Sequence, residues 1–215
     1  MSTPIQTTSV GSMPRSQEVV DFIFAREKGQ DYNQADFDAC MTAHVAETVK
    51  KQADAGITLV SDGETSKISY ATYVKDRYEG FDGDSPRNAP ADLKQFPGFL
   101  KRLADDGGTP TYARPMCVAE IKPKPVDDLA KDLANLRAAV DANPGTRGFM
   151  NAASPGVISL FLQNDFYPSR DAYLAALSDV MKAEYEAIVA AGFDLQLDCP
   201  DLALSRHMLF NDLSD

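Results

Sequence analysis

Acidic side chains follow directly after an apolar segment in the stretch GITLVSDGET, which spans positions 56–65. Residues 57–60 are apolar or β-branched and do not alternate with polar ones, which is typical of a parallel strand buried on both faces. Asp62 and Glu64 then stand at the carboxyl end of this strand, where α/β proteins bind their ligands. Asp-Gly is also an ordinary turn dipeptide, so this stretch alone leaves a site and a surface turn both open.

A polar or carboxylate residue follows each of the predicted strands. These residues are Ser12, Asp62 and Glu64, Glu120, Asn151 and Ser154, and Asp198 and Asp201. A ring of such side chains is how barrel enzymes build their active sites. Asp201 has a second interpretation, which we take as the default, because an Asp at the start of a helical segment is a common N-cap.

The elements that must position these residues follow from hydrophobic spacing. Strands are predicted at 5–10, 57–60, 115–121, 148–153 and 193–197. Helices are predicted after the caps Ser16, Asn33 (over 34–55) and Ser169, and at 126–140 and 202–210. The aromatic segment 67–108 is predicted as a long excursion with a helix at 96–103, and we interpret it as a packing cover over the barrel end rather than as part of the site.

Five strand-then-helix units in a row predict a parallel sheet with right-handed crossovers. An open doubly wound sheet and a (β/α)8 barrel both accommodate this order. Neither G-x-G-x-x-G nor G-x-x-x-x-G-K-[ST] occurs at a strand end, so the nucleotide-binding forms of the open sheet lose their main support. We therefore predict an α/β fold of the (β/α)8 TIM-barrel type with only the first five β/α units present. It would form a single domain over 1–215 that is incomplete at its C-terminus.

Composition limits the partners of this chain. A length of 215 residues with 44% hydrophobic content suits one α/β domain. The formal net charge of −11 argues against binding to nucleic acid or to an anionic membrane, because both require basic patches. The three cysteines lack C-x-x-C spacing, and we recognise neither a signal peptide nor an apolar segment of membrane-spanning length. A reducing, cytoplasmic location is therefore expected.

Four segments carry a resemblance to a known family: TTSVGSMPR near the start, VSDGE at the second predicted strand, SPGVISLF after the fourth, and LQLDCPDLAL at the fifth. In this order they resemble the catalytic, C-terminal half of cobalamin-independent methionine synthase, and above all its shorter relatives that lack the N-terminal half. The resemblance covers 7–204. It implies a (β/α)8 barrel that transfers a methyl group to the thiol of homocysteine, as a step of methionine biosynthesis.

The resemblance also implies roles for individual residues. Val10, Gly11 and Ser12 match the segment that holds the amino-acid substrate, with Ser12 and nearby backbone N–H groups suited to the substrate carboxylate. Glu64 and Asp198 match two residues that contact the substrate ammonium group. Such a role is physically reasonable, because two converging carboxylates can hold one cation through charge-assisted hydrogen bonds.

Three further site candidates depart from the family pattern. Asp62 stands where the family has His, Cys199 replaces a Glu, and Phe161 falls near a Trp that is associated with the folate. These departures leave the methyl donor open, and methyltetrahydrofolate is the donor that the resemblance implies.

The resemblance implies a catalytic zinc ion, which family members bind through His, Cys and Glu residues beyond the fifth strand. Zinc would lower the pKa of the substrate thiol and present a thiolate, which is the nucleophile. His207 is followed by Met208 and Leu209 and not by a Cys two residues on, so no metal ligand and no catalytic residue is assigned in this chain. We expect the complete protein to be an enzyme and this chain alone to be inactive.

The cysteines and His44 favour other roles. Cys40 and His44 have the i, i+4 spacing of a ligand pair, but their helix face is apolar, which favours a core Cys and a partnered core His. Cys117 lies within an apolar strand and is also predicted in the core. Cys199 is near the predicted site, but a Cys nucleophile needs a base, and neither histidine is placed for this role.

Alternative functions stay open. A thiol alkyltransferase like the coenzyme M enzymes, or a relative of uroporphyrinogen decarboxylase, would keep the barrel and change the thiol or the chemistry. A non-catalytic, truncated barrel that binds a small amino acid belongs to a different class. The favoured interpretation, a methionine synthase-like enzyme, predicts a small-molecule thiol like homocysteine as the partner. An incomplete barrel would also expose a strand edge through which the chain could associate with itself.

Overall fold

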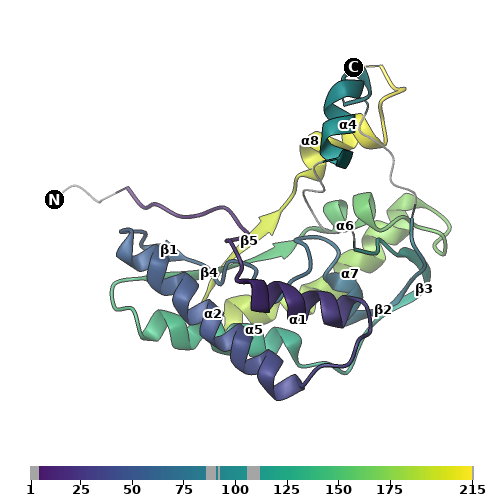
Figure 1. Ribbon diagram of the computed structural model, residues 1–215. Helices are drawn as coiled ribbons and strands as arrows, with labels where there is room; N and C mark the ends of the chain where they lie inside the picture. Colours follow the sequence, from purple (N-terminus) through teal and green to yellow (C-terminus); the bar gives the residue numbers. More distant parts are fainter. Residues whose placement is uncertain (1–4, 86–90, 92, 106–111, 215) are drawn as a thin grey trace.

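The computed structural model describes residues 5–85, 91, 93–105 and 112–214, and the fold is α/β (Figure 1). Its elements are α1 (Gln17–Glu27), α2 (Gln34–Asp54), β1 (Leu59–Val60), α3 (Val74–Arg77), β2 (Tyr78–Asp82), η1 (Leu93–Gln95), α4 (Pro97–Asp105), β3 (Met116–Pro123), α5 (Asp128–Asp141), β4 (Arg147–Ala153), α6 (Pro155–Phe161), α7 (Arg170–Ala190), β5 (Asp194–Asp198) and α8 (Asp201–Met208). Part of the predicted excursion, at 86–90, 92 and 106–108, lies outside the described residues. None of the helices in the described ranges is both long and apolar enough to cross a membrane.

Three strands form a parallel sheet in the order β1-β4-β5. Leu59 of β1 lies opposite Arg147 of β4, and Ala153 at the end of β4 lies opposite Asp198 at the end of β5. On the other side of β1, Thr8 forms an isolated parallel bridge with Leu59. Neighbouring strands therefore follow the order of the chain, and β4 lies between β1 and β5.

The predicted strand at 5–10 is wrong. Ile5 and Val10 are 94 and 82% exposed, and Thr8 alone bridges to β1. The physical reason is that β1 is only two residues long and offers this segment few partners for a hydrogen-bonded ladder.

The prediction of one parallel sheet is wrong for the segment at 115–121. β3 pairs antiparallel with β2 in a separate two-stranded sheet. Cys117 and Ile121 of β3 are buried, whereas Glu120 and Lys122 are exposed and pair with each other. This mixture of buried and exposed positions is typical of an antiparallel strand with one solvent-exposed face. It explains why β3 is not part of the parallel sheet, since the strands of parallel sheets are typically buried on both faces.

Helix starts are confirmed at the predicted caps. The side chains of Ser16, Asn33 and Ser169 accept hydrogen bonds from backbone N–H groups in the first turns of α1, α2 and α7. Gly56 and Gly192 follow α2 and α7 with φ of 81° and 80°, a left-handed conformation that glycine adopts without steric cost. The helices predicted at 96–103, 126–140 and 202–210 are found as α4, α5 and α8.

Helices cover one face of the parallel sheet. Val60 of β1 and Met150 of β4 are fully buried in one cluster with three helix residues, which are Val49 of α2, Leu136 of α5 and Ile188 of α7. Figure 1 shows α2 and α5 side by side beneath the strands. Since successive residues of a strand face opposite ways, the residue after Met150 points to the other face of the sheet.

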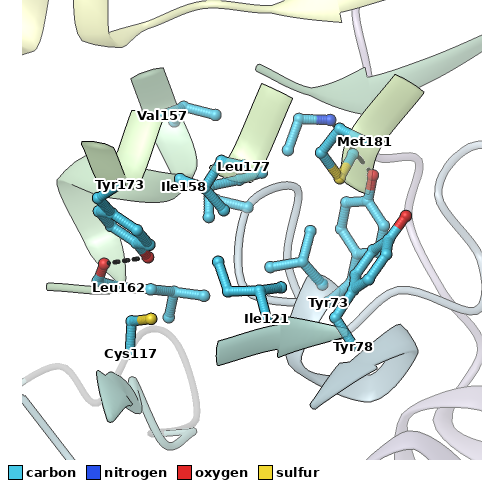
Figure 2. Packing of buried hydrophobic residues seen from close by; sticks show 13 residues of the cluster. Tyr73, Tyr78, Cys117, Ile121, Val157, Ile158, Leu162, Tyr173, Leu177 and Met181 are labelled. Carbon is cyan, nitrogen blue, oxygen red and sulfur yellow. Dashed lines mark hydrogen bonds between the residues drawn. The ribbon is translucent and has the colours of Figure 1, made fainter. Parts of the chain in front are cut away.

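A second buried cluster joins the antiparallel pair to α6 and α7 (Figure 2). Cys117 and Ile121 of β3 lie in this cluster with Ile158 of α6 and with Tyr173 and Leu177 of α7. Burial raises the pKa of the Cys117 thiol to about 11. The predicted core position of Cys117 is therefore confirmed, and its thiol is protonated at neutral pH.

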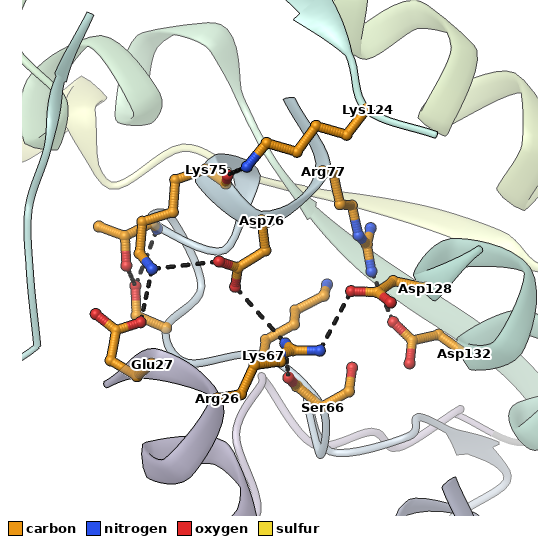
Figure 3. A network of polar contacts seen from close by, with 12 residues as sticks. Arg26, Glu27, Ser66, Lys67, Lys75, Asp76, Arg77, Lys124, Asp128 and Asp132 are labelled. Carbon is orange, nitrogen blue, oxygen red and sulfur yellow. Dashed lines mark hydrogen bonds and ion pairs between the residues drawn. The ribbon is translucent and has the colours of Figure 1, made fainter. Parts of the chain in front are cut away.

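A network of charged groups lies among α1, α3 and α5 (Figure 3), and it includes Arg77 paired with Asp132 at 2.6 Å. Arg77 also pairs with Glu184 at 2.9 Å, and the Tyr73 hydroxyl donates to Glu184 at 2.5 Å. Burial raises the pKa of Asp132 to about 6, against the opposing charge of Arg77. For Glu184 the effect of burial is outweighed by the charges of Arg77 and Lys67, and its pKa is lowered. The guanidinium of Arg77 thus pairs with two carboxylates. As the pH falls, Asp132 takes up a proton before Glu184 does.

Candidate functional site

An open pocket of about 550 Å³ lies at the carboxyl ends of β1 and β5. The residues that line it are Val10, Gly11, Ser12, Glu64, Tyr70, Gln196, Leu197, Asp198, Cys199 and Pro200. The structure therefore brings together the three residues of the predicted substrate segment, the two predicted carboxylates and Cys199. They come from distant parts of the chain that meet only through the sheet.

Glu64 and Asp198 are joined through one amide group. Nδ2 of Asn151 donates to Oε1 of Glu64 at 2.5 Å and to Oδ2 of Asp198 at 2.9 Å. Asn151 lies in the middle strand, β4. Glu64 follows β1 on one side of β4, and Asp198 ends β5 on the other side. The two hydrogens of one nitrogen therefore hold two carboxylates at a single point.

Two further donors complete a ring of hydrogen bonds. Oγ of Ser12 donates to Oε2 of Glu64 at 2.9 Å. Nε2 of Gln196 donates to Oδ1 of Asp198 at 2.9 Å and to the carbonyl of Val10 at 3.2 Å. Each carboxylate oxygen accepts one bond from this ring and keeps lone-pair capacity for a ligand. The ring can therefore present several acceptors to a cationic group in the pocket.

The turn that carries Glu64 has an uncommon backbone. Glu64 has a φ of 57°, in the left-handed region that costs a non-glycine residue about 1–2 kcal/mol. Its N–H donates to Oδ1 of Asp62 at 3.0 Å, and Arg15 donates to its carbonyl at 2.6 Å. At Gly63, where φ is 66°, an added Cβ would lie 2.8 Å from Cβ of Met13. Contacts on both sides of the turn therefore hold the Glu64 carboxylate in place.

Two cations lie beside the carboxylates and bind main-chain oxygens. Arg15 donates to the carbonyls of Glu64 and Lys67, and Lys67 donates to the carbonyl of Asn151 at 2.6 Å. Burial lowers the pKa of Arg15, while nearby carboxylates oppose this effect. The carboxylate oxygens of Glu64 and Asp198, in contrast, accept hydrogen bonds from neutral donors. The two cations therefore leave the hydrogen-bonding capacity of these carboxylate oxygens to a ligand.

The three further site candidates lie in different places. Asp62 is buried behind Glu64, where its carboxylate accepts the Glu64 N–H. Phe161 reaches the pocket through Tyr70, whose ring it meets edge-on with centroids 5.9 Å apart. Cys199 lines the pocket and is half-buried. Of these three, only Cys199 could touch a ligand in the pocket directly.

Three residues of the predicted strand-end ring have other roles. Glu120 lies on the exposed side of β3 and pairs with Lys122 at 2.7 Å. The prediction that Glu120 lies at the site is wrong, because β3 is not part of the parallel sheet. The prediction of Asp201 as an N-cap is also wrong, because Pro200 holds the cap position of α8. Asp201 instead accepts a hydrogen bond from Ser154 at 3.1 Å, and Ser154 caps α6.

His44 is the partnered core histidine that its helix pattern predicts. Its ring lies 3.1 Å from the Thr65 hydroxyl and 3.4 Å from the Thr48 hydroxyl, on the buried face of α2. Cys40 packs at the edge of the buried cluster near α1. Within the described part of the chain, no three His, Cys, Asp or Glu residues form a group that could hold a metal ion. These residues do not fit the implied zinc, and no chemical step is assigned to it.

Sequence patterns missed part of the pocket. They include Asn151 among the strand-end residues without a role, and they omit Tyr70 and Gln196. Gln196 is two residues before Asp198, and the alternation of side chains along a strand could have identified it. Tyr70 belongs to the segment 67–108, which therefore shapes the pocket as well as covering the core.

Comparisons with known proteins agree on one group of enzymes, although no family model matches this chain. A 5-methyltetrahydropteroyltriglutamate–homocysteine methyltransferase from Synechococcus is 30% identical over 78 residues, which is 36% of this chain and 10% of that protein. A methionine synthase from Sulfolobus acidocaldarius is 23% identical over 199 residues, which is 92% of this chain and 52% of that protein.

Solved structures give the same result. A B12-independent methionine synthase from Shewanella sp. W3-18-1, in complex with selenomethionine, matches with a TM-score of 0.60 at 19% identity, over 79% of this chain and 44% of that one. This chain is similar to cobalamin-independent methionine synthases. A second structure of such a synthase, from Listeria monocytogenes, matches with a TM-score of 0.62 at 16% identity, over 92% of this chain and 52% of that one.

The likeness to methionine synthases confirms the resemblance predicted from the four sequence segments, and it establishes the α/β fold. The chain spans about half the length of the Sulfolobus and Listeria methionine synthases.

Proposed function

We propose that this chain provides the amino-acid-binding part of a methionine synthase-like enzyme, which transfers a methyl group to the thiol of homocysteine. One observation carries the proposal: the carboxylates of Glu64 and Asp198 converge on one nitrogen beside an open pocket. A primary ammonium group would make the same kind of contact, because it carries several N–H donors on a single nitrogen. The Shewanella synthase was solved with selenomethionine, an amino acid that carries such a group.

The substrate carboxylate is assigned to the segment 10–12. Ser12 uses its only hydroxyl hydrogen on Glu64, so the backbone N–H groups of this segment are the better donors for the carboxylate. A Cβ at Gly11 would lie 3.0 Å from Oε1 of Glu64, so glycine at this position keeps space between the segment assigned to the substrate carboxylate and the Glu64 carboxylate assigned to the ammonium group.

The order of the strands supports a barrel over an open doubly wound sheet. Neighbouring strands follow chain order from the bridge at Thr8 through β1 and β4 to β5, and α2, α5 and α7 share one face. A doubly wound sheet reverses its strand order at a switch point and carries helices on both faces. We therefore propose that the chain forms part of a single (β/α)8-type domain, with β2 and β3 as an antiparallel arm.

The proposal for this chain is limited to binding of the amino acid. The described residues supply no zinc site, so thiol activation is not assigned to any of them. Cys40, Cys117 and Cys199 are free thiols, which supports a reducing, cytoplasmic location. Methyltetrahydrofolate as the methyl donor and self-association through an open strand edge stay predictions.

Isothermal titration calorimetry with L-homocysteine and L-methionine tests the proposal. The wild-type chain should bind both amino acids. Glu64→Gln and Asp198→Asn should each weaken binding about tenfold or more, because each removes a charge-assisted hydrogen bond to the ammonium group. The analogue 4-(methylthio)butanoic acid, which lacks only the ammonium group of methionine, should show no measurable binding.

Asp194→Asn is the matched control for these variants. Asp194 begins β5, at the opposite end of the strand from Asp198, and pairs with Arg147 on the surface at 2.6 Å. This variant should bind like the wild type. Unchanged affinity in both Glu64→Gln and Asp198→Asn, or equal binding of the analogue without the ammonium group, contradicts the proposal.

A further inference from the structure

We propose that Asn151 is a positioning residue, which holds Glu64 and Asp198 together for one cationic group. The inference rests on the proposed function, because it concerns the same pocket. The Asn151 side chain is only 1% exposed and lies beneath the pocket lining. It therefore acts on a ligand through the two carboxylates and not by touching the ligand itself.

The position of Asn151 in the sheet suits this role. Its neighbour across the ladder is Gln196 of β5, which also donates to Asp198. Its own carbonyl accepts a hydrogen bond from Nζ of Lys67 at 2.6 Å. The backbone and the side chain of Asn151 are thus both held, and a rigid donor can fix the distance between two carboxylates more precisely than a mobile one.

The orientation of the amide follows from its contacts. Both hydrogens of Nδ2 go to carboxylates, whereas Oδ1 is buried and has no hydrogen-bond partner in the described part of the chain. A flipped amide would place Oδ1 against the oxygens of Glu64 and Asp198, and the repulsion excludes this orientation. A buried acceptor without a partner destabilises a fold. Stability alone therefore does not account for an Asn at this place in an apolar strand.

The electrostatic effect of Asn151 is to support two like charges. Two neighbouring carboxylates repel each other, and a donor that is bonded to both offsets part of this repulsion. Asn151 gives each carboxylate a hydrogen bond and adds no charge of its own. The titratable and charged groups that face the pair are Arg15, Asp62, Lys67, Tyr70 and Cys199. Arg15 and Lys67 donate to main-chain carbonyls, so the hydrogen-bonding capacity of the two carboxylates is left for a ligand.

The test compares Asn151→Leu with the wild type, because Leu has a similar size and lacks the amide. Calorimetry with L-methionine at pH 7 gives the affinity. Asn151→Leu should bind about tenfold more weakly than the wild type, because the two carboxylates are no longer held together for the ammonium group.

Asn143→Leu is the matched control, since it removes a neutral amide that donates to the carbonyl of Ala139 at 2.8 Å, before β4 and outside the pocket lining. It should change the affinity by less than about threefold. Asn151→Thr keeps one hydroxyl donor and should fall between Asn151→Leu and the wild type, and it replaces Asn151→Leu if that variant does not fold. An affinity like that of the wild type in the Asn151 variants overturns the inference.

A measurement without ligand separates this inference from the proposed function. Crystal structures of the unliganded chains should show Glu64 and Asp198 on the same Asn151 nitrogen in the wild type, and the two carboxylates further apart in Asn151→Leu. If the wild type does not bind L-methionine, the proposed function fails and the crystal structures still decide the role of Asn151. An unchanged separation of the two carboxylates in Asn151→Leu overturns that role.

Discussion

Glu64 and Asp198 accept hydrogen bonds from the same nitrogen, Nδ2 of Asn151, although they follow different strands. Each also accepts a bond from a second neighbour, which is Ser12 for Glu64 and Gln196 for Asp198. These second donors differ in kind, because a hydroxyl can turn and accept a hydrogen bond, whereas an amide nitrogen can only donate.

This difference predicts unequal costs for two similar substitutions. Glu64→Gln should leave the free energy of unfolding unchanged or raise it by up to about 1 kcal/mol, because its amide can accept from Asn151 and donate to Ser12 while one negative charge is lost. Asp198→Asn should lower it by about 1 kcal/mol, because Asn151 and Gln196 both donate and one loses its acceptor. Urea unfolding followed by circular dichroism measures both. A larger loss in Glu64→Gln would contradict the assigned donors.

Gly63→Ala should lower the free energy of unfolding by about 3 kcal/mol or more, because it combines a left-handed backbone with overpacking. Its φ is 66°, and the added Cβ would lie 2.8 Å from Cβ of Met13 and 2.9 Å from Cγ2 of Thr48. Gly29→Ala is the control, because Gly29 has a φ of 62° and an added Cβ there meets nothing within 4 Å. It should cost only about 1–2 kcal/mol. Equal losses in thermal or urea unfolding would show that the packing around Gly63 is looser than described.

Tyr73→Phe and Tyr173→Phe should differ in cost although both tyrosines are buried. The Tyr73 hydroxyl donates to the charged Glu184, and the Tyr173 hydroxyl donates to the carbonyl of Leu162 at 2.8 Å. A hydrogen bond to a charged group contributes about 1.5–3 kcal/mol and a neutral one about 0.5–1.5 kcal/mol. Urea unfolding should therefore show the larger loss in Tyr73→Phe, and the reverse order would refute the charged state of Glu184.

Asp132→Asn should remove a pH dependence of stability. Burial raises the pKa of Asp132 from 3.8 to about 6, so the folded chain binds this proton more tightly than the unfolded chain. The resulting stability is present below about pH 4 and is lost as the pH rises to about 6, a change of about 3 kcal/mol. Unfolding free energies measured at pH 4, 5, 6 and 7 should decline less steeply in Asp132→Asn. Asp128→Asn, at an ion pair with Arg26, should keep the decline of the wild type. Parallel curves for Asp132→Asn and the wild type would count against the raised pKa.

Local patterns in the sequence determine the helices of this protein. Ser16, Asn33 and Ser169 cap α1, α2 and α7, because a cap requires only a side chain and the backbone of the next turn. The two site carboxylates, Glu64 and Asp198, also follow from short-range signals, namely an apolar run with an acidic residue at its end and segments that resemble one family.

Strand pairing depends on information that local patterns lack. The segment 115–121 has the composition of a strand, but its residues do not indicate which strand it pairs with. In the structure it pairs antiparallel with β2 and does not join the parallel sheet. The segment 5–10 likewise has a strand-like composition, with four β-branched residues, yet β1 offers it too few partners to form a ladder.

Asn151 shows the same division between sequence and structure. In the sequence it is one polar residue in an apolar strand, and its type alone assigns it no partner. Once packing places β4 between β1 and β5, its amide meets Glu64 on one side and Asp198 on the other. Hydrogen bonds between strands depend on which strands become neighbours, and the burial of the whole sheet decides that. The sequence by itself therefore determined the two carboxylates, and only the tertiary structure decided which residue joins them.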